Sequence, residues 1–232
     1  MSSFLIDPYR FGVTDPYFSS VGLLLQPTAG GSIVDLSPSP KTLTVNGQTQ
    51  ISTALGDPTL LFDGSGDSID VANNNVFDTN VPFTCEIDFR VSATSNTVFL
   101  GRGGGAASWS SSNGHQFLLF IEAGVLYWMW NIGGGLNTQV QTTAPTVNVL
   151  HSIIIQYDGT TTQGWLNGSR FGTSTTGYTL PTTRNIVRVG RIPSTETTFD
   201  LNGHIRRLRW TQLSRGYSGT TITVPSYPFP TG

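Results

Sequence analysis

The sequence predicts an all-β protein folded as an antiparallel jelly-roll β-sandwich. The first observation is composition: the 232 residues include 27 Gly and 13 Pro but only three Glu and one Lys, so strand and turn formers dominate. The second is spacing, because short apolar or alternating runs recur roughly every 8 to 12 residues with turn residues between them. None of these runs has a helical period.

The first 20 residues are expected to form an arm. Two similar segments, 7–11 and 15–18, each place a proline after an aspartate and an aromatic residue next. Proline interrupts regular strand pairing and an aromatic ring is stabilised by being covered, so the arm should pack on the sandwich or on a neighbouring subunit. Tyr9 and Tyr17 are its candidate contact residues.

Residues 21–232 are expected to form a single sandwich domain, since no stretch within them resembles a linker and sandwiches of this length are common. The predicted strands are 41–46, 59–62, 83–91, 97–101, 116–122, 125–131, 149–157, 163–166, 169–172, 186–190 and 204–211. The most specific turn is Asn167-Gly168, because both residues tolerate the positive φ angles of a type I′ hairpin.

The charge content argues against several partners. Charged residues make up 11% of the chain and the net charge is -2, so no strong field attracts nucleic acid. No apolar run approaches 18 residues, and the start lacks the pattern of a secretory signal. We therefore expect no membrane partner and synthesis in a cytoplasm.

Arginine is concentrated in the last third of the chain. Seven of the twelve cations are Arg184, Arg188, Arg191, Arg206, Arg207, Arg209 and Arg215. They are expected on the solvent faces of strands or paired with carboxylates. An arginine-rich protein interface is the alternative.

Six segments, in order, resemble the concanavalin A-like lectin/glucanase superfamily and its laminin G-like domains. They are LFDGSGDSIDV (61–71), PFTCEIDF (82–89), LHSIIIQYDG (150–159), GWLNG (164–168), VRVGR (187–191) and LNGHIRRLRW (201–210). The resemblance implies the same sandwich fold. Leu150 stands where the family usually has Trp, and Arg206 and Arg207 replace an acidic pair, which puts any family site that used those acids in doubt.

The flanks of this region resemble versions of the domain found in tailed-bacteriophage structural proteins. The similar segments are DPYFSSVGLLL (15–25), SPSPK (37–41) and SRGY (214–217). The resemblance implies a virion component, released from the host by lysis. Its expected partners are other virion proteins and also a host surface glycan, and the chain is expected to be a homo-oligomer or bound in an assembly.

Glycoside hydrolases of this superfamily carry Glu-x-Asp-x-x-Glu on one strand, which provides a nucleophile and a general acid. Here Glu86 and Asp88 match the first two acids, but Val91 occupies the position of the second glutamate. A hydrolase is therefore not expected, and Glu86 should make structural hydrogen bonds instead.

Other reactive groups also favour structural roles. Cys85 lies within a predicted strand, where a buried, unreactive thiol is the common state. His115, His151 and His204 lack metal-ligand spacing, and no cofactor is expected. Asp63 and Asp67 alternate with small residues as in a calcium loop, yet the EF-hand pattern fails, and a tight turn is the favoured interpretation over a calcium site.

Three tryptophans are candidate contacts with a glycan or a partner. Trp109 lies in a glycine-rich segment, 101–114, that predicts a long loop with few neighbours able to cover an indole. Folding back onto the sandwich is the alternative. Trp128 and Trp130 share one face of their strand, which is either the core or an aromatic platform for a glycan.

The sequence thus leads to a non-enzymatic bacteriophage virion protein as the first functional hypothesis. It would be a capsid decoration, a fibre component or a tail-associated module that contacts neighbouring subunits. The second hypothesis is a lectin-like adhesin that binds host surface polysaccharide through its tryptophans.

Overall fold

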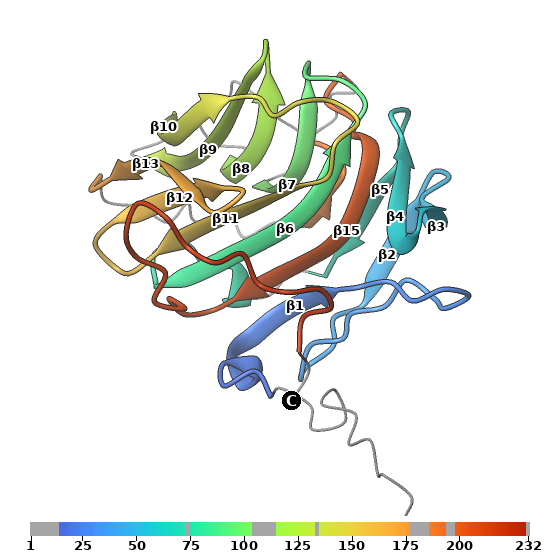
Figure 1. Cartoon of the computed structure of the whole chain (residues 1–232), viewed down its shortest axis with the longest axis horizontal. Helices are drawn as coiled ribbons and strands as arrows, with labels where there is room; N and C mark the ends of the chain where they lie inside the picture. The colour runs from blue at the N-terminus through green and yellow to red at the C-terminus, as the bar shows by residue number, and fades with distance from the viewer. Residues whose placement is uncertain are drawn as a thin grey trace, which may run out of the picture.

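The computed structural model describes residues 14–72, 75–103, 115–132, 135–176, 186–193 and 198–230. Within these ranges the structure contains strands, two 3₁₀ turns, η1 (Phe18–Ser20) and η2 (Asn75–Phe77), and no α-helix. The strands form two antiparallel sheets that stack face to face (Figure 1). The predicted antiparallel jelly-roll β-sandwich is confirmed. No helix in the described part of the chain has the length and hydropathy needed to cross a bilayer.

Sheet A lies at the front of Figure 1 and sheet B behind it. The strands of sheet A are β1 (Val21–Leu25), β3 (Gln50–Leu55), β4 (Asp57–Asp63), β6 (Phe83–Val91), β11 (His151–Tyr157), β12 (Thr162–Leu166), β13 (Ser169–Ser174) and β15 (Asn202–Thr211). Those of sheet B are β2 (Leu43–Asn46), β5 (Ser68–Val71), β7 (Thr97–Gly103), β8 (His115–Glu122), β9 (Val125–Ile132), β10 (Gly135–Thr143) and β14 (Val187–Val189).

Strand β15 is central to sheet A. It pairs with β6 along one side, while β4 and β1 pair with its two halves on the other side. A bulge between Ile205 and Arg207 places Arg206 as an additional residue in this strand. Both Arg206 and Arg207 can therefore lie on the outer face, although strict alternation would separate them.

The core lies between the two sheets and is rich in aromatic rings. Strand β6 alternates strictly, so that Phe83, Cys85, Ile87 and Phe89 point inward and are fully buried. The Phe83 ring stacks on Trp210 at 4.6 Å between centroids. Trp210 also stacks on Phe117 of sheet B at 5.2 Å between centroids, and ring contacts of this kind fix how sheet A packs on sheet B.

The predicted strands correspond to observed strands, and β1, β3, β5 and β10 lie outside the predicted ranges. The Asn167-Gly168 hairpin is confirmed: Leu166 pairs with Ser169, and the φ angles of Asn167 and Gly168 are 51° and 82°. The whole 21–232 unit as one domain, with 1–20 as an arm, stays a prediction.

Candidate functional site

The outer face of sheet A carries facing rows of acids and arginines. The same alternation that buries Phe89 turns Glu86, Asp88 and Arg90 outward on β6. The register sets Glu86 opposite Arg209 and Asp88 opposite Arg207 on β15. Each carboxylate therefore meets a guanidinium directly across the ladder.

Glu86 is enclosed by donors. The Nε and Nη2 atoms of Arg209 donate to its two carboxylate oxygens at 2.5 and 2.7 Å, and the Tyr217 hydroxyl donates at 2.8 Å. Arg215 Nε lies 3.4 Å from the same carboxylate. Burial and the negative charge of Glu86 together raise the pKa of Tyr217, so this hydroxyl stays a proton donor.

Asp15 joins the same network from the opposite end of the chain. It accepts from Arg209 at 2.9 Å and from Arg215 at 3.0 and 2.6 Å. Burial alone would raise the pKa of Asp15, but the hydrogen bonds from Arg215 and the Tyr17 amide, with the charges of Arg215 and Arg209, hold it below its usual value.

Asp88 forms a second centre of the network. It accepts from Arg206 at 2.6 Å and from Arg207 at 2.7 Å, while Arg206 also donates to Asp57 at 3.1 Å. Arg207 is almost fully buried, and burial lowers its pKa despite the opposing effect of Asp88. Arg207 also donates to the backbone oxygens of Pro225 and Ser226.

The C-terminal segment, residues 214–230, covers much of this network. It crosses in front of sheet A and ends beside β1, as Figure 1 shows in red. The ring of Phe229 lies 3.9 and 3.8 Å from the guanidinium carbons of Arg207 and Arg209, and Tyr227 lies 4.7 Å from that of Arg206. The Phe229 amide donates to Gln26 at 2.7 Å.

These contacts give Glu86 a structural role, as the sequence predicts. Its carboxylate is paired on both oxygens and covered, and Val91 points into the core where the hydrolases have a second glutamate. A nucleophile and a general acid flanking one bond are therefore not assembled on β6.

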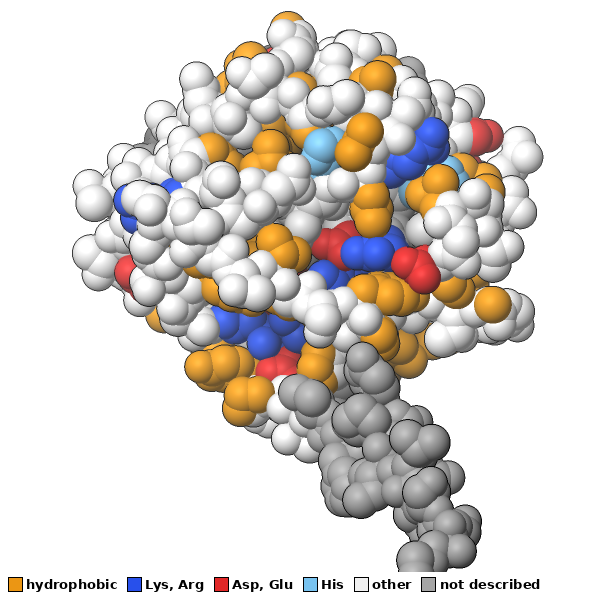
Figure 2. All heavy atoms as spheres, in the orientation of Figure 1, with side chains coloured by type: hydrophobic (Ala, Val, Ile, Leu, Met, Phe, Trp, Pro, Cys, Tyr) orange, Lys and Arg blue, Asp and Glu red, His pale blue; other side chains and the backbone are white. Residues whose placement is uncertain are grey.

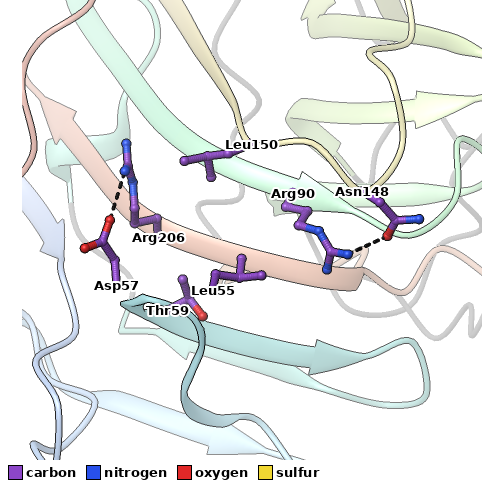
Figure 3. A pocket seen from close by; sticks show the side chains of 7 residues that line it. All are labelled: Leu55, Asp57, Thr59, Arg90, Asn148, Leu150 and Arg206. Atoms are coloured by element: carbon purple, nitrogen blue, oxygen red, sulfur yellow. Dashed lines mark hydrogen bonds and ion pairs between the residues drawn. The ribbon is translucent and has the colours of Figure 1, made fainter.

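One part of the outer face remains open, beside the β3–β4 hairpin. A pocket of about 190 Å³ is lined by Leu55, Asp57, Thr59, Arg90, Asn148, Leu150 and Arg206. In Figure 3 the Arg206–Asp57 pair and the Arg90–Asn148 pair lie at opposite ends, with Leu55 and Leu150 between them. Figure 2 shows acidic and basic side chains together in a hollow of this face.

A second pocket of about 200 Å³ adjoins the first and shares Leu150 and Arg206 with it. Its other walls come from β11, from the Asn167 turn and from Val224 and Pro225 of the C-terminal segment. His151 is fixed there, because its ring nitrogens contact the Thr146 carbonyl and the Asn167 amide, each at 2.9 Å. The candidate binding face is therefore a groove of two pockets.

Of the two alternatives for the face of Trp128 and Trp130, the structure shows the core, and the glycan platform is wrong. Both side chains are fully buried between the sheets, and Trp128 packs on Phe83 and Phe117. The opposite face of β9 is also covered, because Tyr127 and Met129 pack on a separate apolar cluster of sheet B. Because both faces of β9 pack on apolar clusters, both carry apolar side chains. Alternation alone therefore does not show which face of the strand points into the core.

The other predicted contacts have varied outcomes. Tyr17 is 36% exposed, and the guanidinium carbon of Arg215 lies 5.2 Å from its ring. Tyr9 and Trp109 lie outside the described residues, so their roles stay predictions. The paired state predicted for the arginines is confirmed for Arg188, which binds Asp70 with two hydrogen bonds, and for those facing Glu86 and Asp88.

Asp63 and Asp67 stabilise a turn, the favoured interpretation of their pattern. Asp63 accepts from the Ser65 amide, and Asp67 accepts from the amides of Asp63 and Gln48. In the described ranges no group of three or more His, Cys, Asp or Glu side chains is placed to hold a metal ion.

Sequence reasoning missed the pocket itself. Leu55, Asp57, Arg90 and Asn148 belong to no motif, and they meet only because β4, β6 and β15 are neighbours in sheet A. The available signals were the two departures from the family pattern, at Leu150 and at Arg206-Arg207, and all three of these residues line the groove.

The two stacked antiparallel sheets define a lectin-like β-sandwich. The chain belongs to the concanavalin A-like lectin/glucanases superfamily, whose laminin G model matches residues 63–215. No curated protein sequence matches the chain.

Solved structures of similar fold include binding domains of botulinum neurotoxins and of Paraclostridial Mosquitocidal Protein 1. The binding domain of botulinum neurotoxin serotype D/C aligns with a TM-score of 0.61 and 14% identity, over 84% of this chain and 49% of that one. The binding domain of Paraclostridial Mosquitocidal Protein 1 gives 0.60 and 16%, over 84% and 49%. A structure of botulinum neurotoxin type C, whose cell entry is dependent upon interaction with two ganglioside molecules, gives 0.62 and 12%, over 85% and 49%. This chain spans about half the length of these chains.

Proposed function

We propose that this chain is a non-enzymatic structural module of a tailed-bacteriophage virion that contacts neighbouring subunits. The observation that carries the proposal is where the phage-like flanks lie. Asp15 from the first flank and Arg215 and Tyr217 from the last converge on Glu86, where hydrolases of the superfamily have their nucleophile. The segments that resemble phage proteins are thus the ones that close this face.

This role predicts partners along the arm and the exposed rim of the sandwich. Tyr17, at the end of the arm, presents a partly exposed ring held by Arg215, as expected of an aromatic contact residue. Assembly as a capsid decoration, a fibre component or a tail-associated module, with localisation to the virion after lysis, belongs to the same proposal.

Mass spectrometry of purified particles of the phage that encodes the chain tests this role. The chain should be present at a fixed copy number per particle and should stay bound through gradient purification. Its absence from intact particles would refute the proposal. Incubation of the purified chain with laminarin-like glucans should release no reducing ends, and steady release would contradict the non-enzymatic part.

A second candidate function, glycan recognition as an adhesin, is favoured by the groove of two pockets. Small polar pockets with a few hydrogen-bonding groups and apolar walls suit sugar rings, and the type C neurotoxin of similar fold interacts with gangliosides. The sites for such a ligand would be the groove and Trp109, since Trp128 and Trp130 are buried. A glycan array probed with the folded chain tests this function, and an array without any ligand would exclude it.

A further inference from the structure

Most of the charges on the outer face of sheet A form ion pairs, but Arg90 at the pocket does not pair with any described carboxylate. Within the described residues, four guanidiniums pair with four carboxylates, namely Arg206, Arg207, Arg209 and Arg215 with Asp15, Asp57, Glu86 and Asp88. Arg90 is a fifth guanidinium on this face, and it has no ion pair with a described carboxylate. The pocket therefore carries one positive charge without a counter-charge among the described residues.

Arg90 is held in place but keeps donors free. Its Nη2 donates to Asn148 Oδ1 at 2.8 Å, and its other N–H groups make no hydrogen bond to the described residues. Because a guanidinium has five N–H donors in a planar fork, Arg90 can still bind a carboxylate with two hydrogen bonds.

The histidine opposite Arg90 in the ladder does not add to this charge. His204 is opposite Arg90 in the ladder, and its Nδ1 lies 2.9 Å from the Thr59 hydroxyl oxygen. Burial, and then the charge of Arg90, lower the pKa of His204, so the imidazole is neutral at physiological pH. Arg90 therefore acts on the pocket as an isolated positive charge.

The rest of the pocket fits a single ring. Its volume of about 190 Å³ is below the roughly 300 to 1,000 Å³ typical of sites for drug-sized ligands. Leu55 and Leu150 are 37% and 39% exposed and lie between the polar ends of the pocket (Figure 3). Apolar walls with hydrogen-bonding groups at both ends suit a sugar ring, which has apolar C–H surfaces and hydroxyl groups at its edge.

We propose that this pocket binds an acidic sugar residue, such as a uronic or sialic acid, through its carboxylate. Arg90 pairs with the sugar carboxylate, Leu55 and Leu150 cover the ring, and Asp57 accepts hydrogen bonds from hydroxyls at the far end. The negative charge of Asp57 does not repel the ligand carboxylate strongly, because Asp57 is paired with Arg206. This assignment rests on the proposed glycan-recognition function and names the ligand class for it.

Isothermal titration with a uronic-acid disaccharide and with its methyl ester tests the assignment. The acid should bind at least about 10-fold more tightly than the ester, since a charge-assisted pair is lost on esterification. Higher salt should lower the affinity for the acid but not for the ester, because the pocket is open to solvent and salt screens the charge pair. A sialylated trisaccharide and its neutral, desialylated form provide the same comparison for the other acid.

Two variants and one control assign the effect to Arg90. Arg90→Gln should reduce the affinity for the acid about 10-fold or more. Asn148→Asp should do the same while leaving Arg90 in place, because the new carboxylate neutralises it, and aspartate tolerates the φ angle of 61° at this position. Arg170→Gln, on β13 and outside the pocket, removes the same charge and should bind like the wild type.

The outcomes separate this assignment from the function it deepens. If the ester or the neutral sugar binds as well as the acid, or if Arg90→Gln has no effect, the assignment is wrong while glycan recognition stands. If no saccharide binds, both the acidic-sugar assignment and the glycan-recognition function are wrong. If an acidic peptide binds at Arg90 and the saccharides do not, the pocket is a protein contact and the assignment is again wrong.

Discussion

Arg209 and Glu86 face each other across β15 and β6 as a two-pronged ion pair, with side chains only 3% and 2% exposed. Two buried charges of this kind are stable only as a pair, because each would be costly to desolvate alone. The pair also links the two halves of the network, since Arg209 reaches Asp15 as well. Two predictions test this network and the segment that covers it, and two more test the surroundings of His204 and Cys85.

Arg209→Met should lower the free energy of unfolding by about 3–5 kcal/mol, because it leaves Glu86 and Asp15 buried with less counter-charge. Urea denaturation followed by tryptophan fluorescence measures this loss. Asp57→Asn is the matched control: Asp57 is 47% exposed, so loss of its pair with Arg206 should cost about 0–1 kcal/mol. Equal losses in the two variants would contradict the buried network.

Phe229→Ala should lower the free energy of unfolding by about 3–5 kcal/mol, because the ring is 2% exposed and covers two guanidiniums. Phe229→Leu should cost less, since it retains apolar volume and loses only the ring face. Limited proteolysis gives a second measurement: cleavage within 214–230 should speed up in Phe229→Ala. If Phe229→Ala has the cleavage rate and the free energy of unfolding of the wild type, residues 214–230 do not close the outer face of sheet A.

His204 should titrate below the usual histidine pKa of about 6.5 in the folded protein, because it is desolvated and lies near Arg90. The unfolded chain then binds more protons than the folded one between the two pKa values. Stability is therefore present above about pH 6.5 and is lost as the pH falls toward the folded pKa. NMR titration should also show a higher pKa for His204 in Arg90→Gln. A pKa at or above about 6.5 for His204 in the wild type would contradict the assigned environment.

Cys85 should be unreactive in the native state. The thiol is fully buried, and burial, with a smaller effect of Glu86, raises its pKa far above the ordinary value. Labelling with a thiol-specific disulfide reagent should be negligible in buffer and complete after unfolding in urea. Rapid labelling of the folded protein would place Cys85 at the surface and contradict the inward alternation of β6.

Local patterns were sufficient to predict the sandwich. Period-two alternation in β6 and the φ-positive turn at Asn167 and Gly168 act within a few residues, so the sequence predicts them directly. The absence of the second glutamate of the hydrolase motif could also be predicted from the sequence, because Val91, at its position, is in the same strand as Glu86. These features need no knowledge of which strands are neighbours.

The binding face could not be predicted in the same way. Arg90, Asn148 and Leu55 are far apart in sequence and meet only through the strand order of sheet A. The orientation of Trp128 and Trp130 depends on the apolar cluster around Phe120 and Phe199, which covers the other side of sheet B. Phe229 covers the network through contacts of its ring with Arg207 and Arg209. No periodic pattern in the sequence predicts these contacts.

The position of β15 has a consequence for how the chain is made. The ribosome synthesises β1, β4 and β6 before β15, yet all three pair with β15. Until residues 202–211 emerge, those strands have unpaired edges that invite aggregation. Sheet A is therefore completed only after residues 202–211 have been synthesised, and a nascent chain stalled before residue 202 should depend on chaperones to stay in solution.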